Sequence, residues 1–209
     1  MEQVLARPHL VSLAAGFTDD ATLPVSETRR LLAQLLSRRT TGEPALQYGS
    51  TAGLPGLRRL TASRLHAQDA ATGEGCTDER AYTSDAVVIT HGSQQLLYLL
   101  SEVLCDPGDV VLVEDPTYFV FLSILQCRGV EARGIPLTPH GIDLNRLKAV
   151  LDQLHREDRL RRVKMLYMVS YHQNPTGTTT SFACKTAILD LLRHYERRAG
   201  HPIYLLEDA

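Results

Sequence analysis

Lysine is scarce in this chain. The 22 basic residues include three lysines, Lys148, Lys164 and Lys185, and all the others are arginines. Together with 24 acidic residues they give a net charge of -2. This balance provides no excess of positive charge to attract nucleic acid or an anionic membrane, so we expect neither as a partner. A reaction that requires a lysine amine has only these three side chains to use.

Paired cysteines and long apolar runs are also missing. The four cysteines form no CxxC motif and lie far apart, at Cys76, Cys105, Cys127 and Cys184. We therefore expect reduced thiols, which suit the cytosol, and no metal site. No run reaches the roughly 18 apolar residues that span a bilayer, and the first residues contain no apolar run of signal-peptide length. The sequence thus predicts a soluble cytoplasmic protein.

The chain is nevertheless long and apolar enough for a sizeable core. Its 209 residues are 44% hydrophobic, which suits one domain with an appended arm. Leucines at helical spacing predict a helix over 26–39, ended by the segment 40–44. Pro55 is suited to the first position of a second helix. The stretch 69–84 is polar and is predicted to be an exposed excursion.

From residue 87 onward, short apolar runs alternate with helical patterns. Strands are predicted at 87–90, 110–113, 130–135, 165–169 and 203–206. Helices are predicted between and after them, at 96–104, 116–126, 143–154 and 183–198. Continuous apolar strands separated by helices favour a mostly parallel sheet that is covered on both faces. The predicted fold is therefore an α/β three-layer sandwich, and its ligands are expected outside the carboxyl ends of the strands.

Two groups of polar residues lie at such strand ends in the first half of the sheet. Thr90-His91-Gly92-Ser93-Gln94-Gln95 joins a strand to a helix, so free backbone N–H groups there favour a phosphate. A plain helix cap is the alternative for the same Gly-Ser pair. Tyr118 is predicted in the first turn of the helix that Pro116 opens, where its ring is suited to a flat aromatic cofactor. An ordinary half-buried tyrosine is the alternative for this residue.

Two further groups follow the later strands. Asn174-Pro175-Thr176-Gly177 forms a turn in which the Asn174 amide is suited to donate to a phenolate oxygen, although Asn-Pro turns are common. Asp208 ends an apolar strand, where a carboxylate is costly to bury unless it is paired. Beside a pyridine nitrogen it would favour the protonated ring, and as a helix cap it would have no such role.

In this combination the chain resembles the fold-type I pyridoxal-phosphate aminotransferases, class I and II, of the aspartate aminotransferase superfamily. The resemblance covers nearly all of residues 10–209. It is strongest to the branch of 2-aminoadipate transaminases, through the motifs Leu46-Gln47-Tyr48, Gly92-Ser93-Gln94-Gln95 and Gln173-Asn174-Pro175-Thr176-Gly177. The resemblance implies a homodimer that binds pyridoxal 5'-phosphate and moves an amino group between an amino acid and a 2-oxo acid.

The resemblance also implies roles for individual residues. Ser93 and Gln94 would hold the cofactor phosphate, with Tyr48 reaching it from the partner subunit. Tyr118 would stack on the ring, Asn174 would bond its O3′, and Asp208 would pair with its N1. Gly16 would lie near the substrate carboxylate. Residues 1–45 would be an amino-terminal arm and helix of the small domain, and 46–209 the first part of the large domain.

One part of the family's machinery has no counterpart in this sequence. The family forms its Schiff base with a lysine well downstream of the Asp, and none of the three lysines lies in a motif suited to that chemistry. We therefore expect an amino-terminal fragment, incomplete at the carboxyl end of the large domain and inactive alone. The alternatives are other pyridoxal-phosphate chemistry such as β-elimination, the aminotransferase-like domain of a transcriptional regulator, or a non-catalytic remnant.

Overall fold

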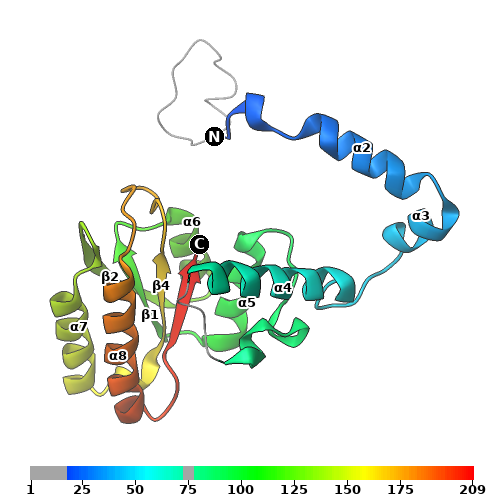
Figure 1. Cartoon of the computed structure of the whole chain (residues 1–209). Helices are drawn as coiled ribbons and strands as arrows, with labels where there is room; N and C mark the ends of the chain where they lie inside the picture. Colours follow the sequence, from blue (N-terminus) through cyan, green and yellow to red (C-terminus); the bar gives the residue numbers. More distant parts are fainter. Residues whose placement is uncertain (1–17, 73–77) are drawn as a thin grey trace, which may run out of the picture. The chain divides into compact units, whose positions relative to one another are not determined.

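The computed structural model describes residues 18–72 and 78–209. The chain divides into two compact units, residues 1–87 and residues 88–209, and each is described here by itself. Figure 1 follows the chain through both units. The domain boundary predicted between residues 45 and 46 stays a prediction.

The first unit is helical. Its elements are η1 (Asp20–Thr22), α2 (Val25–Leu36), α3 (Arg39–Leu46), α4 (Pro55–Thr72), η2 (Glu79–Tyr82) and η3 (Ser84–Ala86). The predicted helix over 26–39 is wrong at its end, because the helix stops at Leu36 and a new one begins at Arg39. The Thr41 hydroxyl donates to the free carbonyl of Leu35 at 2.6 Å, which stabilises a corner before the segment expected to end the helix.

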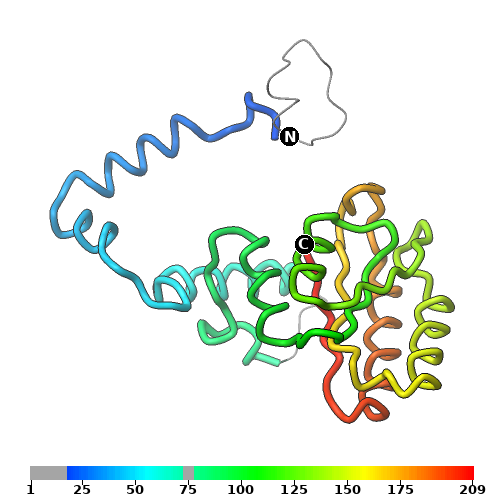
Figure 2. Tube along the Cα trace, turned by 180° about the vertical axis from the view of Figure 1, so that it is seen from behind, coloured from blue at the N-terminus to red at the C-terminus, as the bar shows by residue number. Residues whose placement is uncertain are grey.

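The second unit contains a sheet that is mostly parallel. Its strands are β1 (Val110–Asp115), β2 (Glu131–Thr138), β3 (Gly141–Ile142), β4 (Val163–Val169) and β5 (Tyr204–Asp208). Their order is β3-β2-β1-β4-β5, and only the β2–β3 pair is antiparallel. Figure 2 shows β5 beside β4 from the back of the molecule. The predicted α/β class with a mostly parallel sheet is confirmed.

Helices cover both faces of this sheet. On one face α5 (Ser93–Leu104) and α6 (Phe119–Cys127) contribute to a buried cluster with alternate strand residues such as Val113 and Tyr167. On the other face α7 (Leu144–Arg156) and α8 (Phe182–Ala199) pack on the remaining strand residues, among them Leu166, together with η4 (Leu160–Arg162). Neighbouring strand residues therefore point into different cores, which is the period-two alternation of a pleated strand.

Side chains fix where the covering helices begin. The Asp143 carboxylate accepts from the N–H groups of Asn145 and Arg146, so it caps α7 as predicted. The Ser181 hydroxyl accepts from the N–H of Cys184 and caps α8. These caps determine where the loops after β3 and β4 end.

One predicted strand, which begins at the boundary between the two units, needs correction. The segment predicted as a strand at 87–90 pairs with no strand among the described residues, although Val87 has extended backbone angles. The Val87 carbonyl instead accepts from Arg58 Nε at 2.8 Å, so a side chain takes the place of a strand partner. No pattern in the sequence predicts β3, because its two residues are too few to show an alternation of apolar and polar side chains.

Candidate functional site

The loops after β1 and β4 and the end of β5 lie at the same edge of the sheet. The strands are parallel and adjacent, and Val169 pairs with Asp208 at that edge. The loop after β1 carries Tyr118, the loop after β4 carries Asn174, and β5 ends at Asp208. The structure thus places three residues predicted from separate motifs at the same end of the sheet.

The amino end of α5 has free backbone donors. Gly92 has φ +86°, a conformation that favours glycine, and no side chain caps the helix. Ser93 and Gln94 open the helix and are exposed. Leu97, one turn later, lies in the same buried cluster as Tyr167. The first turn is therefore suited to bind an anion, and its helix packs on the same face of the sheet as Tyr167.

Gln95 belongs to the motif at the start of α5, but the sequence indicates no role for it. Its Oε1 accepts from the N–H of His91 at 2.7 Å, so the side chain reaches back across the turn and holds the loop before the helix. Glutamine three residues after the cap is the position from which a capping box reaches back, although here the bond goes to His91 and not to the cap Gly92. His91, Gln94 and Gln95 also line a pocket of about 450 Å³ that reaches Tyr98 and Ile124.

Tyr118 lies one residue before α6. The sequence placed it inside the first turn, but Tyr118 has extended backbone angles and the helix begins at Phe119. Pro116 fixes its own φ and restricts Asp115 before it, and the helix begins only three residues after the proline. The Tyr118 side chain is half-buried and packs against the cluster on the α5 and α6 face. Its ring remains at the sheet edge.

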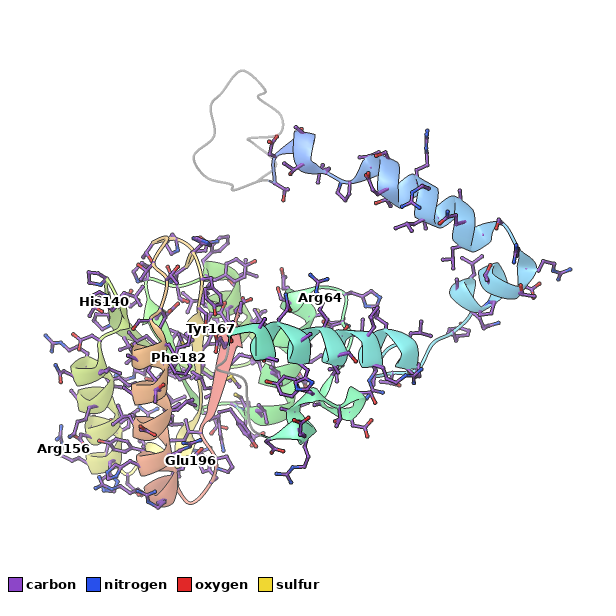
Figure 3. The ribbon with its side chains drawn as sticks, in the orientation of Figure 1. Arg64, His140, Arg156, Tyr167, Phe182 and Glu196 are labelled. Carbon is purple, nitrogen blue, oxygen red and sulfur yellow. The ribbon has the colours of Figure 1, made fainter. Side chains whose placement is uncertain are left out.

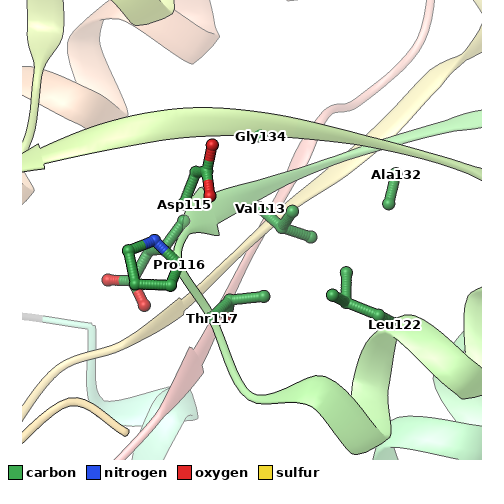
Figure 4. A pocket seen from close by; sticks show the side chains of 8 residues that line it. Val113, Asp115, Pro116, Thr117, Leu122, Ala132 and Gly134 are labelled. Carbon is green, nitrogen blue, oxygen red and sulfur yellow. The ribbon is translucent and has the colours of Figure 1, made fainter. Parts of the chain in front are cut away.

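A pocket opens beside this loop on the same face of the sheet. It has a volume of about 460 Å³, and Figure 4 shows the residues that line it, among them Val113, Asp115, Thr117 and Leu122. Gly134 provides room for Asp115, because a Cβ at residue 134 would lie 3.0 Å from the Asp115 Cβ. Thr117 Oγ1 is buried and has no hydrogen-bond partner among the described residues.

The Asp208 side chain is half-buried, and one of its two carboxylate oxygens accepts a hydrogen bond. The hydroxyl of Tyr167 donates to Asp208 Oδ2 at 3.0 Å. Among the described residues no donor reaches Oδ1. Because the carboxylate is paired and lies at the sheet edge, it is suited to accept one further hydrogen bond from a ligand.

Beneath the loops lies a buried polar group centred on Gln173 and Glu114, each 1% exposed. Gln173 Nε2 donates to Glu114 Oε2 at 3.1 Å and to the Pro116 carbonyl at 2.8 Å. Burial raises the pKa of Glu114, and the hydrogen bonds from the Val169 N–H and Gln173 oppose this shift. Glu114 Oε1 has no partner among the described residues. The motifs assigned no role to either residue.

Gln173 also holds the turn that presents Asn174. Its Oε1 accepts from the Thr176 N–H at 2.9 Å and from the Thr176 hydroxyl at 2.7 Å. Asn174 itself is exposed, and no hydrogen bond to its side chain occurs in the part of the chain that the structure describes. The amide is therefore free to bond a ligand.

The three lysines are all paired with carboxylates. Lys148 contacts Asp152 at 2.6 Å on α7, and Lys164 lies 3.6 Å from Asp109 near the amino end of β4. Lys185 forms an ion pair with Glu207. These pairs place no free lysine amine at the edge that carries Asn174 and Asp208.

Lys185 is the lysine nearest in the chain to the predicted site, but it faces the other way. Leu205 packs in the α7 and α8 core and Leu206 in the α5 and α6 core, so alternation puts Glu207 and Asp208 on opposite faces. Burial lowers the pKa of Lys185, but the Glu207 carboxylate and Tyr171 outweigh it and the net shift is upward. A lysine that stays charged is a poor nucleophile.

Two predicted site residues do not lie in this unit. Tyr48 belongs to the first unit, and its side chain is 98% exposed. Gly16 lies outside the described residues. Within residues 18–72 and 78–209, no helix is both long and apolar enough to cross a membrane, and no cluster of three metal-ligating side chains occurs.

Comparison of the sequence with known proteins finds relatives among the aminotransferases. The chain is 33% identical over 190 residues to an uncharacterized aminotransferase of Saccharolobus solfataricus, covering 90% of this chain and 44% of that protein. It is 30% identical over 186 residues to the 2-aminoadipate transaminase of Thermus thermophilus, covering 89% of this chain and 41% of the relative. The chain thus spans less than half the length of these relatives.

A solved structure agrees with the sequence matches. The kynurenine aminotransferase of Pyrococcus horikoshii, in complex with PMP, superposes with a TM-score of 0.81 at 28% identity, covering 99% of this chain and 47% of that chain. The family model described as aminotransferase class I and II matches residues 8–199. The chain therefore belongs to the class I and II aminotransferases.

Proposed function

We propose that this chain supplies the cofactor-binding part of a transaminase that moves an amino group between an amino acid and a 2-oxo acid. The observation that carries the proposal is that Tyr118, Asn174 and Asp208 follow or end neighbouring parallel strands at one end of the sheet, in the same unit as the uncapped start of α5. Family membership supports the same reaction class.

Pyridoxal 5'-phosphate fits the donors at this edge. The backbone N–H groups at the start of α5, with Ser93 and Gln94, suit its phosphate. Tyr118 offers a ring to stack on, the Asn174 amide a donor for the phenolate oxygen, and Asp208 Oδ1 an acceptor for the ring nitrogen. When bound, this cofactor supplies an electron sink for the bond-breaking at the amino acid.

The remaining roles come from the family resemblance and from the sequence. We assign Tyr48 to the phosphate of the partner subunit in a homodimer, and Gly16 to the substrate carboxylate. Residues 1–45 would form part of the small domain and 46–209 the first part of the large domain. We place the protein in the cytoplasm.

The ion pairs of the three lysines limit the chemistry that these 209 residues can perform alone. Because Lys148, Lys164 and Lys185 are each held by a carboxylate, we propose that none is the Schiff-base lysine. The chain then binds pyridoxal phosphate without a covalent bond and does not transfer amino groups by itself.

The test combines binding with covalent trapping. Titration of the chain with pyridoxal phosphate, followed by absorbance, should show saturable binding that Asp208→Asn weakens. Borohydride reduction and peptide mass analysis should leave the three lysines unmodified. Stoichiometric phosphopyridoxyl on one of them would refute the lysine assignment, and absence of saturable binding would refute the cofactor site.

The alternative functions share this site. β-Elimination and the aminotransferase-like domain of a transcriptional regulator use the same cofactor, and no contact in the described residues favours either. A longer protein that contains this site and a Schiff-base lysine should produce a 2-oxo acid from an amino donor only when an acceptor is supplied. Release of pyruvate without an acceptor would favour elimination instead.

A further inference from the structure

Tyr167 lies on the same face of the sheet as Asp208. Tyr167 pairs with Leu206 and Val169 pairs with Asp208, so the two side chains are diagonal neighbours across β4 and β5. Figure 3 labels Tyr167 next to β5. The 3.0 Å hydrogen bond from its hydroxyl to Asp208 Oδ2 follows from this register.

The Tyr167 ring has little freedom to move. The side chain is 0% exposed and lies against Phe121, with ring centroids 4.3 Å apart and planes tilted by 44°. Phe121 is itself 0% exposed, so the hydroxyl direction is set by core packing. Burial raises the pKa of Tyr167, and the Asp208 carboxylate raises it further, so the hydroxyl stays protonated and remains a donor.

We propose that Tyr167 is the positioning residue for the ring nitrogen of the cofactor. Its hydroxyl occupies Asp208 Oδ2 and fixes the carboxylate plane, which leaves Oδ1 directed to the ligand. Tyr167 touches neither substrate nor cofactor and acts only through Asp208. This inference rests on the proposed function, because it concerns the same cofactor site.

A carbocyclic analogue of pyridoxal phosphate isolates this effect. With a C–H in place of the ring nitrogen, the analogue keeps the phosphate, aldehyde and phenol but cannot bond Asp208. Wild-type protein should bind pyridoxal phosphate more tightly than the analogue. Tyr167→Phe should lower the affinity for pyridoxal phosphate about tenfold, as loss of one hydrogen bond to a charged group predicts, and change analogue binding less than about twofold.

The chain contains a matched control. Tyr195 is also buried, and its hydroxyl also donates to a carboxylate, that of Asp152, but it packs in the α7 and α8 core. Tyr195→Phe removes the same atom from a comparable setting away from the site. It should leave both affinities unchanged. In an Asp208→Asn background, Tyr167→Phe should add less than about a twofold loss, because its partner is already altered.

A second measurement uses the wild-type protein and does not depend on how the variant folds. With tyrosine labelled at Cζ by ¹³C, the Tyr167 resonance should shift when pyridoxal phosphate binds and stay in place when the analogue binds. Equal shifts with both ligands, or an equal loss of both affinities in Tyr167→Phe, would overturn the inference while leaving the cofactor site intact. If wild-type protein binds neither ligand, the proposed function fails and the inference with it.

Discussion

Gln173 Nε2 donates to the carbonyl of Pro116 at 2.8 Å, so one buried amide joins the loop that leads to Tyr118 with the turn that presents Asn174. Its Oε1 holds the turn through Thr176. The spacing between the ring-stacking and amide residues of the proposed site therefore depends on a side chain below them.

Replacement of Gln173 by leucine should be costly. Gln173→Leu leaves the Pro116 carbonyl and the Thr176 N–H without these partners, and we expect a loss of about 3 kcal/mol in the free energy of unfolding. Gln153→Leu is the control. The Gln153 side chain is exposed on α7 and, among the described residues, bonds only Glu157, so its loss should change stability by less than about 0.5 kcal/mol. Urea titration of both variants measures the difference. Equal losses would mean that Gln173 fills space rather than joining loops.

Glu114 should make stability depend on pH. Because burial raises the pKa of Glu114 above its ordinary 4.5, the folded protein holds this proton more tightly than the unfolded chain. Its contribution to stability is fully present below the ordinary pKa and is lost as the pH rises through the raised value. Glu114→Gln cannot ionise, so its stability relative to wild type should rise between pH 4.5 and 8, on the order of 1 kcal/mol.

Thr117→Val serves as the control for that experiment. It removes a buried hydroxyl with no partner among the described residues and introduces nothing that titrates. The gap between Thr117→Val and wild type should stay constant across the same pH range. If the stability difference between Glu114→Gln and wild type were equally constant with pH, folding would not change the pKa of Glu114.

Gly141 should tolerate no side chain. It has φ +118°, and a Cβ there would lie 2.6 Å from Thr180 Cγ2 and 2.9 Å from Thr180 Oγ1. We expect Gly141→Ala to cost more than about 2 kcal/mol through strain and overpacking. Gly177 has φ +74°, but no atom lies within 4 Å of the place that a Cβ would take. Gly177→Ala should therefore lower the free energy of unfolding by about 1 kcal/mol. Adding Thr180→Ala to Gly141→Ala should restore part of the loss in thermal unfolding. No restoration would trace the cost to the backbone alone.

Tyr48 should matter for cofactor binding but not for folding of its own chain. Its side chain is 98% exposed, so Tyr48→Phe should change the free energy of unfolding by less than about 0.5 kcal/mol. In the proposed dimer it should lower the affinity for pyridoxal phosphate. Mixing Tyr48→Phe with Asp208→Asn chains should regenerate one intact site per heterodimer, measured as bound cofactor per dimer. Heterodimers without a tight site would place Tyr48 in the site of its own chain.

The two central strands, β1 and β4, could be predicted because they are buried on both faces, whereas β2 and β5 are partly exposed. Continuous apolar runs such as 110–113 and 165–169 give a strong signal, and the Asp143 cap locates α7. The segment 87–90 has the same composition but no strand beside it, and pairing is a property that composition does not encode. The helix after Pro116 begins later than predicted, at Phe119, because helix boundaries depend on local backbone angles that residue types alone do not determine.

The proposed site also has parts that local sequence patterns predict and parts that depend on strand pairing. Ser93, Asn174 and Asp208 lie in short motifs whose residue types suggest their chemistry. Their supports, Tyr167 and Glu114, lie on other strands and are brought close only by strand register. Sequence separation between partners, such as 59 residues for Glu114 and Gln173, hides these contacts from any local pattern.

Glu207 and Asp208 are consecutive acids with different partners, one held by a lysine in the α7 and α8 layer and the other by Tyr167. A shift of β5 by a single residue would move each acid to the opposite face of the sheet, so that the aspartate would leave the face that carries Tyr167. One residue inserted into or deleted from the short connection 200–203 would thus disable the proposed site without altering any residue assigned to it. The proposed function therefore requires the correct register of this one strand.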